Sequence, residues 1–182
     1  MKIIYPLIIL LLTSCQQIKP NNDKTKNNSN YNPEARLEKL GIELPRVSDP
    51  VANYVRVVRT GNLLFLSGSG PKKQDGSYII GKVGEDLTLK EGYKAARLTG
   101  INHLSTLKSE IGDLKRVKKI VKVLGMVNCT PDFTDQPKVI NGFSDLMVEV
   151  FGDKGKHARS AVGMASLPIG IAVEIELIVE VE

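Results

Sequence analysis

The sequence is poor in the residue types that most often build metal sites, disulfides and nucleic-acid stacking surfaces. It contains no Trp, four Phe and five Tyr, so no platform of aromatic rings for stacked bases is evident. Its two histidines, His103 and His157, do not cluster with Cys or acidic residues at ligand spacing, and we expect no metal site. These shortages argue against a metalloprotein and against a nucleic-acid-binding protein.

One of the two cysteines, Cys15, ends a short N-terminal export signal. A charge at Lys2 precedes an apolar run from Ile3 to Leu12, and the ending Leu-Thr-Ser-Cys resembles a bacterial lipobox. About ten apolar residues are too few to span a bilayer, which needs about 20. We expect residues 1–14 to be a lipoprotein signal peptide and Cys15 to be acylated, with an ordinary cleaved signal or a chance apolar start as the alternatives.

Lipid on Cys15 would attach the protein to a membrane of the cell envelope, because two or three acyl chains anchor a protein stably. Gln16 follows the cysteine in place of an aspartate, which favours the periplasmic side of the outer membrane. Residues 15–33 are rich in Asn and Lys and have almost nothing to bury, so they are predicted to form a disordered tether. Residues 34–182 then form a single domain.

The basic character of the chain comes partly from outside that domain. The whole chain carries a net charge of +5, but Lys2 leaves with the signal, and the tether holds Lys19, Lys24 and Lys26 against Asp23. The domain keeps 21 basic and 19 acidic residues, a net charge of +2, which gives little support for nucleic-acid binding. The basic cluster within 115–122 is accordingly interpreted as a solvated surface in preference to an RNA track.

The second cysteine, Cys129, follows an apolar strand with no base near it in sequence, so we interpret it as a small buried hydrophobe. With Cys15 used for lipid, no intrachain disulfide is available.

Hydrophobic periodicity predicts an α+β domain. Strands are expected at 55–58, 63–67 and 117–127, followed by two further strands near the C-terminus. A capping box at Thr88–Glu91 opens one helix that runs toward Gly112, and Pro137 opens a second helix that Gly152 stops. The order ββ(β)αβαββ predicts a mixed sheet with two helices on one face, and the other face must then be covered by something else.

The last two strands are predicted to form a hairpin that brings charged residues together. The returning strand 172–180 alternates strictly, with Glu174 and Glu176 on the face opposite its apolar residues. A hairpin of this length would place Arg159 near the level of both acids, so an arginine fork and a carboxylate would meet at one sheet edge. In this arrangement the arginine could bind a small carboxylate ligand while the neighbouring carboxylate transfers a proton or orients a water. The alternative is a cross-strand salt bridge on a solvated face, and Glu176 in particular is expected to be a solvated or salt-bridged partner.

Several of these motifs together resemble the reactive-intermediate deaminase (Rid) family, also called YjgF-like or L-PSP endoribonuclease, which has a chorismate-mutase-like fold. The resemblance rests on His157-Ala158-Arg159-Ser160, Leu167-Pro168 and Val173–Glu176, on the second-strand motif Gly61–Gly68, on Tyr54 seven residues before Gly61, and on Asn141 in the second helix. It covers about 51–181, nearly the whole domain.

The resemblance implies a homotrimer in which three subunits pack their uncovered sheet faces into a central barrel, with ligand clefts at the subunit boundaries. It implies that Arg159 grips a substrate carboxylate, that Glu174 positions or activates a hydrolytic water, and that no cofactor is needed. Tyr54 and Asn141 would line the cleft from the same or the adjacent subunit, and Gly68 would allow close approach of the ligand. Packing at the start of a strand is the alternative for Tyr54, and capping or bridging a loop is the alternative for Asn141.

The sequence also departs from the family pattern. Ala161 stands where many deaminating members have a cysteine, and Ser67–Pro71 reads Ser-Gly-Ser-Gly-Pro in place of Ser-Gly-Gln-Ile-Pro. The segment Gly81–Gly84 before the first helix resembles a longer-chain subgroup. The resulting hypothesis is hydrolysis of a small 2-imino or enamine carboxylic acid to a 2-keto acid and ammonia. A non-catalytic trimeric binder of small carboxylates is the alternative, and ribonuclease activity ranks third because the domain is near neutral and has no histidine pair placed for acid–base cleavage.

Overall fold

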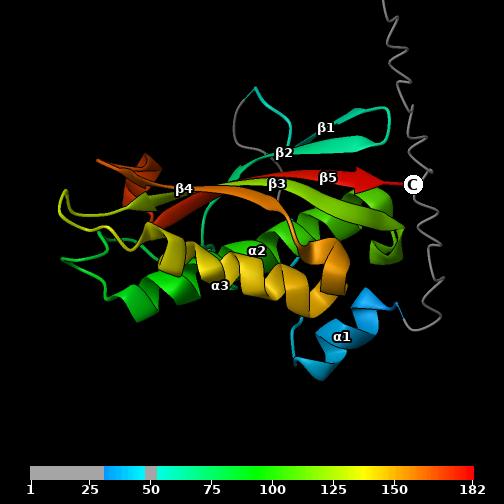
Figure 1. Ribbon diagram of the computed structural model, residues 1–182, viewed down its shortest axis with the longest axis horizontal. Helices are drawn as coiled ribbons and strands as arrows, with labels where there is room; N and C mark the ends of the chain where they lie inside the picture. The colour runs from blue at the N-terminus through cyan, green and yellow to red at the C-terminus, as the bar shows by residue number, and fades with distance from the viewer. Residues whose placement is uncertain (1–30, 48–52) are drawn as a thin grey trace, which may run out of the picture.

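The structure is a computed structural model, and it describes residues 31–47 and 53–182. One mixed sheet and the helices packed against it make up this part of the chain (Figure 1). The helices are α1 (Pro33–Lys39), α2 (Leu89–Ile111) and α3 (Gln136–Phe151), and the strands are β1 (Val57–Thr60), β2 (Leu63–Ser69), β3 (Val117–Asn128), β4 (Ala158–Met164) and β5 (Val173–Val181). Short 3-10 turns occupy Leu114–Arg116, Gly152–Gly155 and Pro168–Gly170. The predicted α+β class is confirmed.

The five strands lie in the order β1-β2-β5-β3-β4. Strand β3 pairs parallel with β4, the strand that follows the crossover through α3, whereas the other neighbouring pairs are antiparallel. Strand β3 therefore lies between β4 and β5. The predicted hairpin of the last two strands is wrong, because each pairs with β3 and neither pairs with the other.

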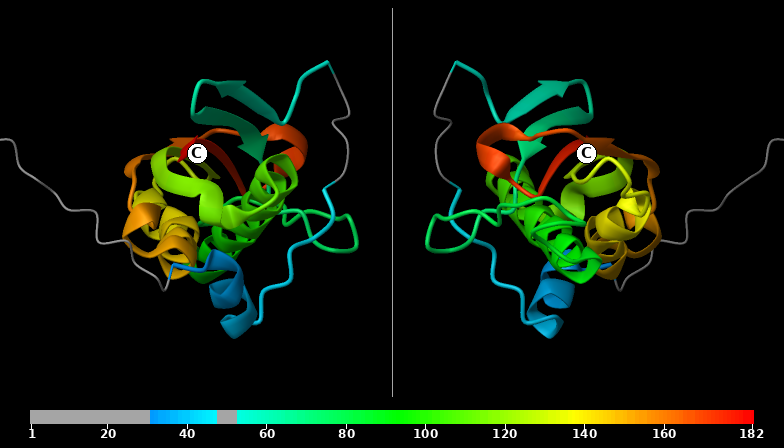
Figure 2. Two further views of the ribbon diagram at one scale, coloured as in Figure 1. Left: turned by 90° about the vertical axis from the view of Figure 1, so that its right-hand side faces the viewer. Right: turned by 90° about the vertical axis from the view of Figure 1, so that its left-hand side faces the viewer.

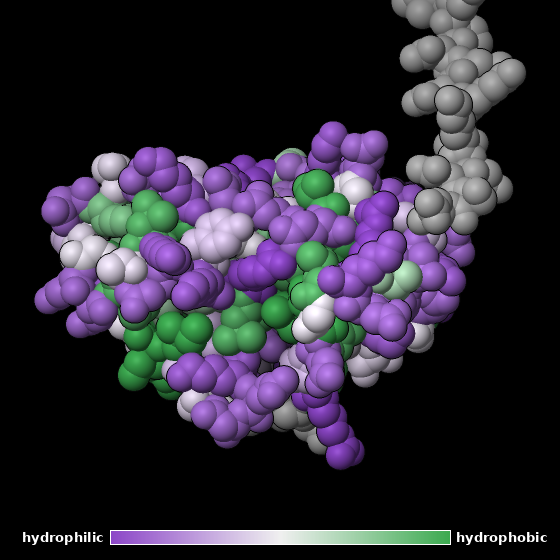
Figure 3. Space-filling model, turned by 90° about the horizontal axis from the view of Figure 1, so that it is seen from below, coloured by the Kyte–Doolittle hydropathy of each residue, from purple (hydrophilic) through white to green (hydrophobic). Residues whose placement is uncertain are grey.

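Helices α2 and α3 pack side by side on one face of the sheet, as the side views show (Figure 2). The alternation of β5 supplies the core on that face: Val173, Ile175, Leu177, Val179 and Val181 are buried, whereas the residues between them point to the other face and stay partly or fully exposed. The helical side of the molecule presents a mainly hydrophilic surface with separate hydrophobic patches (Figure 3). The predicted two helices on one sheet face are confirmed.

Local signals explain where the two long helices begin and end. Thr88 and Glu91 form the predicted capping box at the start of α2, with both reciprocal hydrogen bonds present. Pro137 occupies the first turn of α3, where its missing N–H costs nothing, and Gly152 ends that helix with a φ of 62° that favours glycine.

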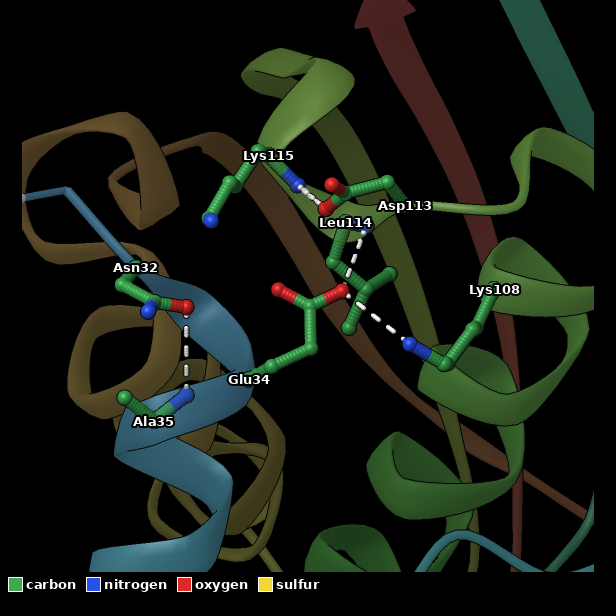
Figure 4. Close-up of polar contacts among 7 residues, drawn as sticks. All are labelled: Asn32, Glu34, Ala35, Lys108, Asp113, Leu114 and Lys115. Carbon is green, nitrogen blue, oxygen red and sulfur yellow. Dashed lines mark hydrogen bonds and ion pairs between the residues drawn. The ribbon is translucent and has the colours of Figure 1, made fainter.

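A third helix, α1, extends the fold toward the N-terminus and was not predicted. Its Leu37 is buried, and its Glu34 accepts hydrogen bonds from Lys108 Nζ at 3.2 Å and from the backbone N–H of Leu114 at 2.9 Å (Figure 4). Asn32 caps the helix by accepting from Ala35 N–H at 3.2 Å. These contacts tie α1 to the end of α2 and the turn that follows it.

The fold starts slightly earlier than the tether boundary predicts. Tyr31 donates a hydrogen bond to the carbonyl of Val117 at 3.0 Å, and the Lys154 ammonium lies 3.6 Å from the centroid of its ring. Three residues assigned to the tether, Tyr31, Asn32 and Pro33, thus contact the domain, because an aromatic ring and a helix cap supply the partners that the tether composition otherwise lacks. The predicted signal, Cys15 and the rest of the tether lie outside the described residues. No helix within 31–47 or 53–182 is long and apolar enough to cross a membrane.

Candidate functional site

Arg159 is held by three oxygens of helix α3. The register with Val123 of β3 directs Arg159 to the helical side of the sheet. Its Nη1 donates to Asn141 Oδ1 and to Ser144 Oγ, each at 2.9 Å, and its Nη2 donates to the Pro137 carbonyl at 3.3 Å. These three residues follow one face of the helix, so the fork is oriented by a rigid element. No ion pair among the described residues includes Arg159, so its charge is not neutralised by an acid there.

His157 completes this cluster behind Ser144. Its Nδ1 lies 2.7 Å from the Gly155 carbonyl, which can only accept, so Nδ1 is assigned the proton. Its Nε2 then accepts from the Ser144 hydroxyl at 3.0 Å, which leaves the Ser144 oxygen free to accept from Arg159. Burial, together with the charge of Arg159, lowers the pKa of His157, so the imidazole is neutral at neutral pH. We call Arg159, Asn141, Ser144 and His157 the arginine cluster.

Glu174, Gly68 and Tyr54 form a second group, the glutamate cluster. Glu174 points away from the helices on β5, and Gly68 lies on the neighbouring strand β2, where the pairing is interrupted between Leu66 and Ser69. A Cβ at Gly68 would lie 2.2 Å from Glu174 Oε1, so only glycine leaves room for the carboxylate. Tyr54 and Gly68 line the same pocket, and Tyr54 is 49% exposed.

The Glu174 carboxyl is suited to proton transfer. Burial, and secondarily the charge of Glu176, raise its pKa above the ordinary value of 4.5. A carboxyl with a raised pKa is a better base once it is ionised. Glu176 itself is exposed and makes no ion pair among the described residues, which fits the solvated role expected for it and excludes a salt bridge with Arg159 in this part of the chain.

The two clusters do not meet within one chain. Glu174 is paired with Met126 of β3 on the face away from the helices, whereas Arg159 is on the helical face and β3 separates the two strands. The predicted convergence of Arg159 with Glu174 at one sheet edge is therefore wrong for a single subunit. The register along the sheet was nearly right, since Arg159 and Leu177 both pair with Val123.

No helix of the described residues covers the sheet face that carries Glu174, and this face is partly apolar. Val58 is 54% exposed and Phe65 is 40% exposed. They line a hollow of about 310 Å³ together with Leu124, Ile178 and Lys122. Such a face is typical of a surface that another chain covers.

Sequence reasoning missed Ser144 and gave His157 no role. The signal was present for two of the three contacts, because Asn141 and Ser144 are three residues apart, which places their side chains on one helix face. Cys129 is buried beside Gln136, as expected for a small hydrophobe. Within the described ranges, no group of three or more His, Cys, Asp or Glu side chains has the arrangement of a metal site.

The sequence profile of the YjgF/chorismate mutase-like family matches residues 34–181. The chain belongs to this family. The match spans both clusters and covers the whole sheet, so the fold and the candidate site are parts of one family domain.

Several individual proteins are similar to the chain over most of its length. The chain is 46% identical over 147 residues to the protein TCP17 of Trypanosoma cruzi, covering 80% of this chain and 92% of that protein. It is 28% identical over 142 residues to a 2-iminobutanoate/2-iminopropanoate deaminase of Dermatophagoides farinae, covering 78% and 95%. Among solved structures, the protein Atu1372 of Agrobacterium tumefaciens, whose function is unknown, superposes with a TM-score of 0.76 at 42% identity, covering 82% and 94%.

Proposed function

We propose that the protein is a cofactor-free deaminase that hydrolyses a small 2-imino or enamine carboxylic acid to a 2-keto acid and ammonia. The observation that carries the proposal is the Arg159 fork, which α3 orients and which no acid among the described residues neutralises. A planar guanidinium held in this way is suited to a bidentate contact with a carboxylate. The similarity to an iminobutanoate/iminopropanoate deaminase supports this substrate class.

The chemistry needs one water and one proton acceptor. Water adds to the carbon of the protonated C=N bond, and Glu174 takes the proton that the water loses. Glu174 then gives that proton to the nitrogen of the resulting carbinolamine. The C–N bond breaks to release ammonia while Glu174 accepts the proton of the hydroxyl group, so a C=O group forms, and Glu174 passes this proton to the departing ammonia. Arg159 holds the carboxylate throughout, so the reacting carbon stays beside Glu174.

Because Arg159 and Glu174 lie on opposite sheet faces, the proposal requires that they come from different subunits. We propose a homotrimer in which the uncovered, partly apolar faces pack together, and each cleft combines the arginine cluster of one subunit with the glutamate cluster of its neighbour. The exposed Val58 and Phe65 support this, since burying them would be favourable. A non-catalytic binder of small carboxylates would use the same composite cleft without turnover.

The test is ammonia release from 2-imino acids that an amino-acid oxidase generates in the same solution. Arg159→Ala is expected to lower the rate at least about 100-fold, since charge-assisted bidentate contacts are strong. Arg97→Ala is the matched control, because this substitution also removes one positive charge. Arg97 pairs with Glu149 on the helical surface, away from both clusters. Full ammonia release by Arg159→Ala would disprove the mechanism, whereas keto-acid binding without any turnover by the unaltered protein would favour the binder.

For location, we propose that lipid on Cys15 holds this domain at the cell envelope, on the periplasmic side of the outer membrane. The support is the sequence pattern at residues 1–16 alone.

A further inference from the structure

A second positively charged pocket lies next to the glutamate cluster. Five separate segments surround a cavity of about 160 Å³: residues 45–47, the approach to β1, the end of β2, Lys72 and Tyr78 of the loop that follows β2, and the middle of α2. One molecule of liquid water takes about 30 Å³, so the cavity has room for a carboxylate or phosphate group. Its lining includes Arg46 and Arg56, and no acidic residue is among the described residues that line it.

Neither arginine is neutralised by the described part of the protein. No hydrogen bond or ion pair of the Arg46 or Arg56 guanidinium occurs there, and Arg56 Nε is buried without a partner. A buried charged donor without an acceptor is costly, since it has lost water and gained nothing in return. An oxyanion in the cavity would supply the missing acceptor.

Tertiary contacts fix the backbone on both sides of the pocket. The Ser105 hydroxyl of α2 donates to the carbonyl of Pro45, which holds the residue before Arg46 against the helix. Ser67 N–H donates to the Arg56 carbonyl at 2.9 Å, and Ser67 Oγ donates to the Val55 carbonyl at 2.7 Å. Both backbone positions are therefore set by the fold.

The pocket adjoins the proposed reaction site through shared residues. Tyr54 and Gly68 line the cavity, and Gly68 also contacts Glu174. Glu174 itself does not line the cavity, so a substrate that reacts at Glu174 must extend past Gly68 to reach the two arginines.

We propose that the Arg46–Arg56 pocket binds a second oxyanion group of the substrate, a carboxylate or a phosphate, so that the preferred substrate carries two anionic groups. The inference rests on the proposed function for the first anionic group, which Arg159 of a neighbouring subunit holds. The Arg46–Arg56 pocket holds the other one.

Binding to the full-length protein by calorimetry tests this with three probes of the same length. Butyrate has one carboxylate, succinate has two, and 3-phosphonopropionate replaces one of these by a phosphonate. At least one of succinate and 3-phosphonopropionate is expected to bind at least about tenfold more tightly than butyrate. The second anionic group would accept hydrogen bonds from charged donors, which are among the stronger hydrogen bonds. The tighter of the two identifies the oxyanion that the pocket prefers.

Arg56→Gln is expected to bring the affinity ratio of the dianion to butyrate close to one. Arg46→Gln is expected to reduce the same ratio, and it keeps the test valid if the partly buried Arg56 is needed for folding, because Arg46 is exposed. Arg59→Gln is the matched control: this exposed arginine of β1 donates to backbone carbonyls of Gly61 and Glu182, and its loss changes the net charge equally.

The pocket assignment would be overturned if the three probes bound equally, or if neither Arg46→Gln nor Arg56→Gln changed the affinity ratio. Either result would not bear on the deaminase proposal, which the ammonia assay tests separately. An arginine-dependent preference for dianions in a protein that turns over no imine would support the pocket and refute the deaminase.

Discussion

Arg159 and Glu174 lie on opposite faces of one sheet, on strands that β3 separates. If both act on one substrate, two subunits must contribute to each site. Co-expression of Arg159→Ala and Glu174→Gln chains is then expected to restore activity that each variant lacks alone. In a randomly mixed ring, about a quarter of the clefts would combine two intact halves, so about a quarter of the normal ammonia release should return.

The matched control for this complementation pairs two lesions in the same cluster. Glu174→Gln co-expressed with Gly68→Val leaves no cleft with an intact glutamate cluster, so no activity should return. Absence of recovery in the first mixture, with mixed trimers verified by mass spectrometry, would rule out a composite site.

The charge of Glu176 is expected to shift the acidic limb of the activity profile. Burial raises the pKa of Glu174 most and the charge of Glu176 adds to it, so Glu176→Gln should lower that pKa and move the acidic limb of kcat/KM to lower pH. Glu180→Gln is the control, since Glu180 lies further along the same face and accepts from Asn62 at 3.0 Å. An unchanged limb in Glu176→Gln would show that Glu174 is not the group that titrates.

Gly68→Ala is expected to remove activity while the fold survives. The new Cβ would lie 2.2 Å from Glu174 Oε1, and the end of a flexible side chain can swing away. Gly142→Ala gives the contrast, because its Cβ would lie 2.0 Å from the Tyr93 carbonyl oxygen, which the backbone of α2 holds in place. We expect Gly142→Ala to lower the free energy of unfolding by about 1–3 kcal/mol or more, as overpacking does, and Gly68→Ala to leave the thermal midpoint nearly unchanged. A large loss of stability in Gly68→Ala would contradict the flexible role of Glu174.

Buried His103 is expected to make stability depend on pH. Burial lowers its pKa to about 4, while its Nε2 lies 2.8 Å from the Ile175 carbonyl. Because the His103 side chain binds a proton near pH 6.5 in the unfolded chain and only near 4 in the folded chain, its contribution to the free energy of unfolding should be constant above about 6.5 and should fall as pH drops toward 4. The loss attributable to this residue is roughly 3 kcal/mol at most. Urea unfolding between pH 5 and 7 should show this slope, and His103→Gln should reduce it whatever its effect on absolute stability; the slope that remains comes from His157, whose pKa burial also lowers.

Sequence patterns predicted the parts of the fold that local chemistry controls. The capping box at Thr88, Pro137 at the start of α3 and the alternation of β5 each act within a few residues, so they were found at nearly the right positions. Which strand lies beside which is set by long-range packing, and two strands joined by a short link look like a hairpin whether or not a third strand lies between them. The insertion of β3 between β4 and β5 was therefore missed, and with it the separation of Arg159 from Glu174.

The proposed lipid anchor has a direct test in cells. Cys15→Ser is expected to leave the domain folded and to move the protein from the membrane fraction to the soluble fraction. Gln16→Ser is the control, since it leaves the acylated residue in place. A Cys15→Ser protein that stayed with the membranes would exclude lipid on this residue as the anchor.

The boundary between tether and domain is expected to lie just before Tyr31. A chain that begins at Tyr31 keeps the hydrogen bond to Val117 and the Asn32 cap of α1, whereas a chain that begins at Pro33 loses both. Loss of a helix cap costs about 1 kcal/mol, and loss of a hydrogen bond costs a similar amount. The free energy of unfolding of the shorter chain should therefore be about 1–3 kcal/mol lower. Tyr31→Phe separates the two effects, because it keeps the ring beneath the Lys154 ammonium and removes only the hydroxyl. Equal free energies of unfolding of the two truncated chains in urea would mean that the contacts of Tyr31 and Asn32 add no stability and that the fold begins at α1 itself.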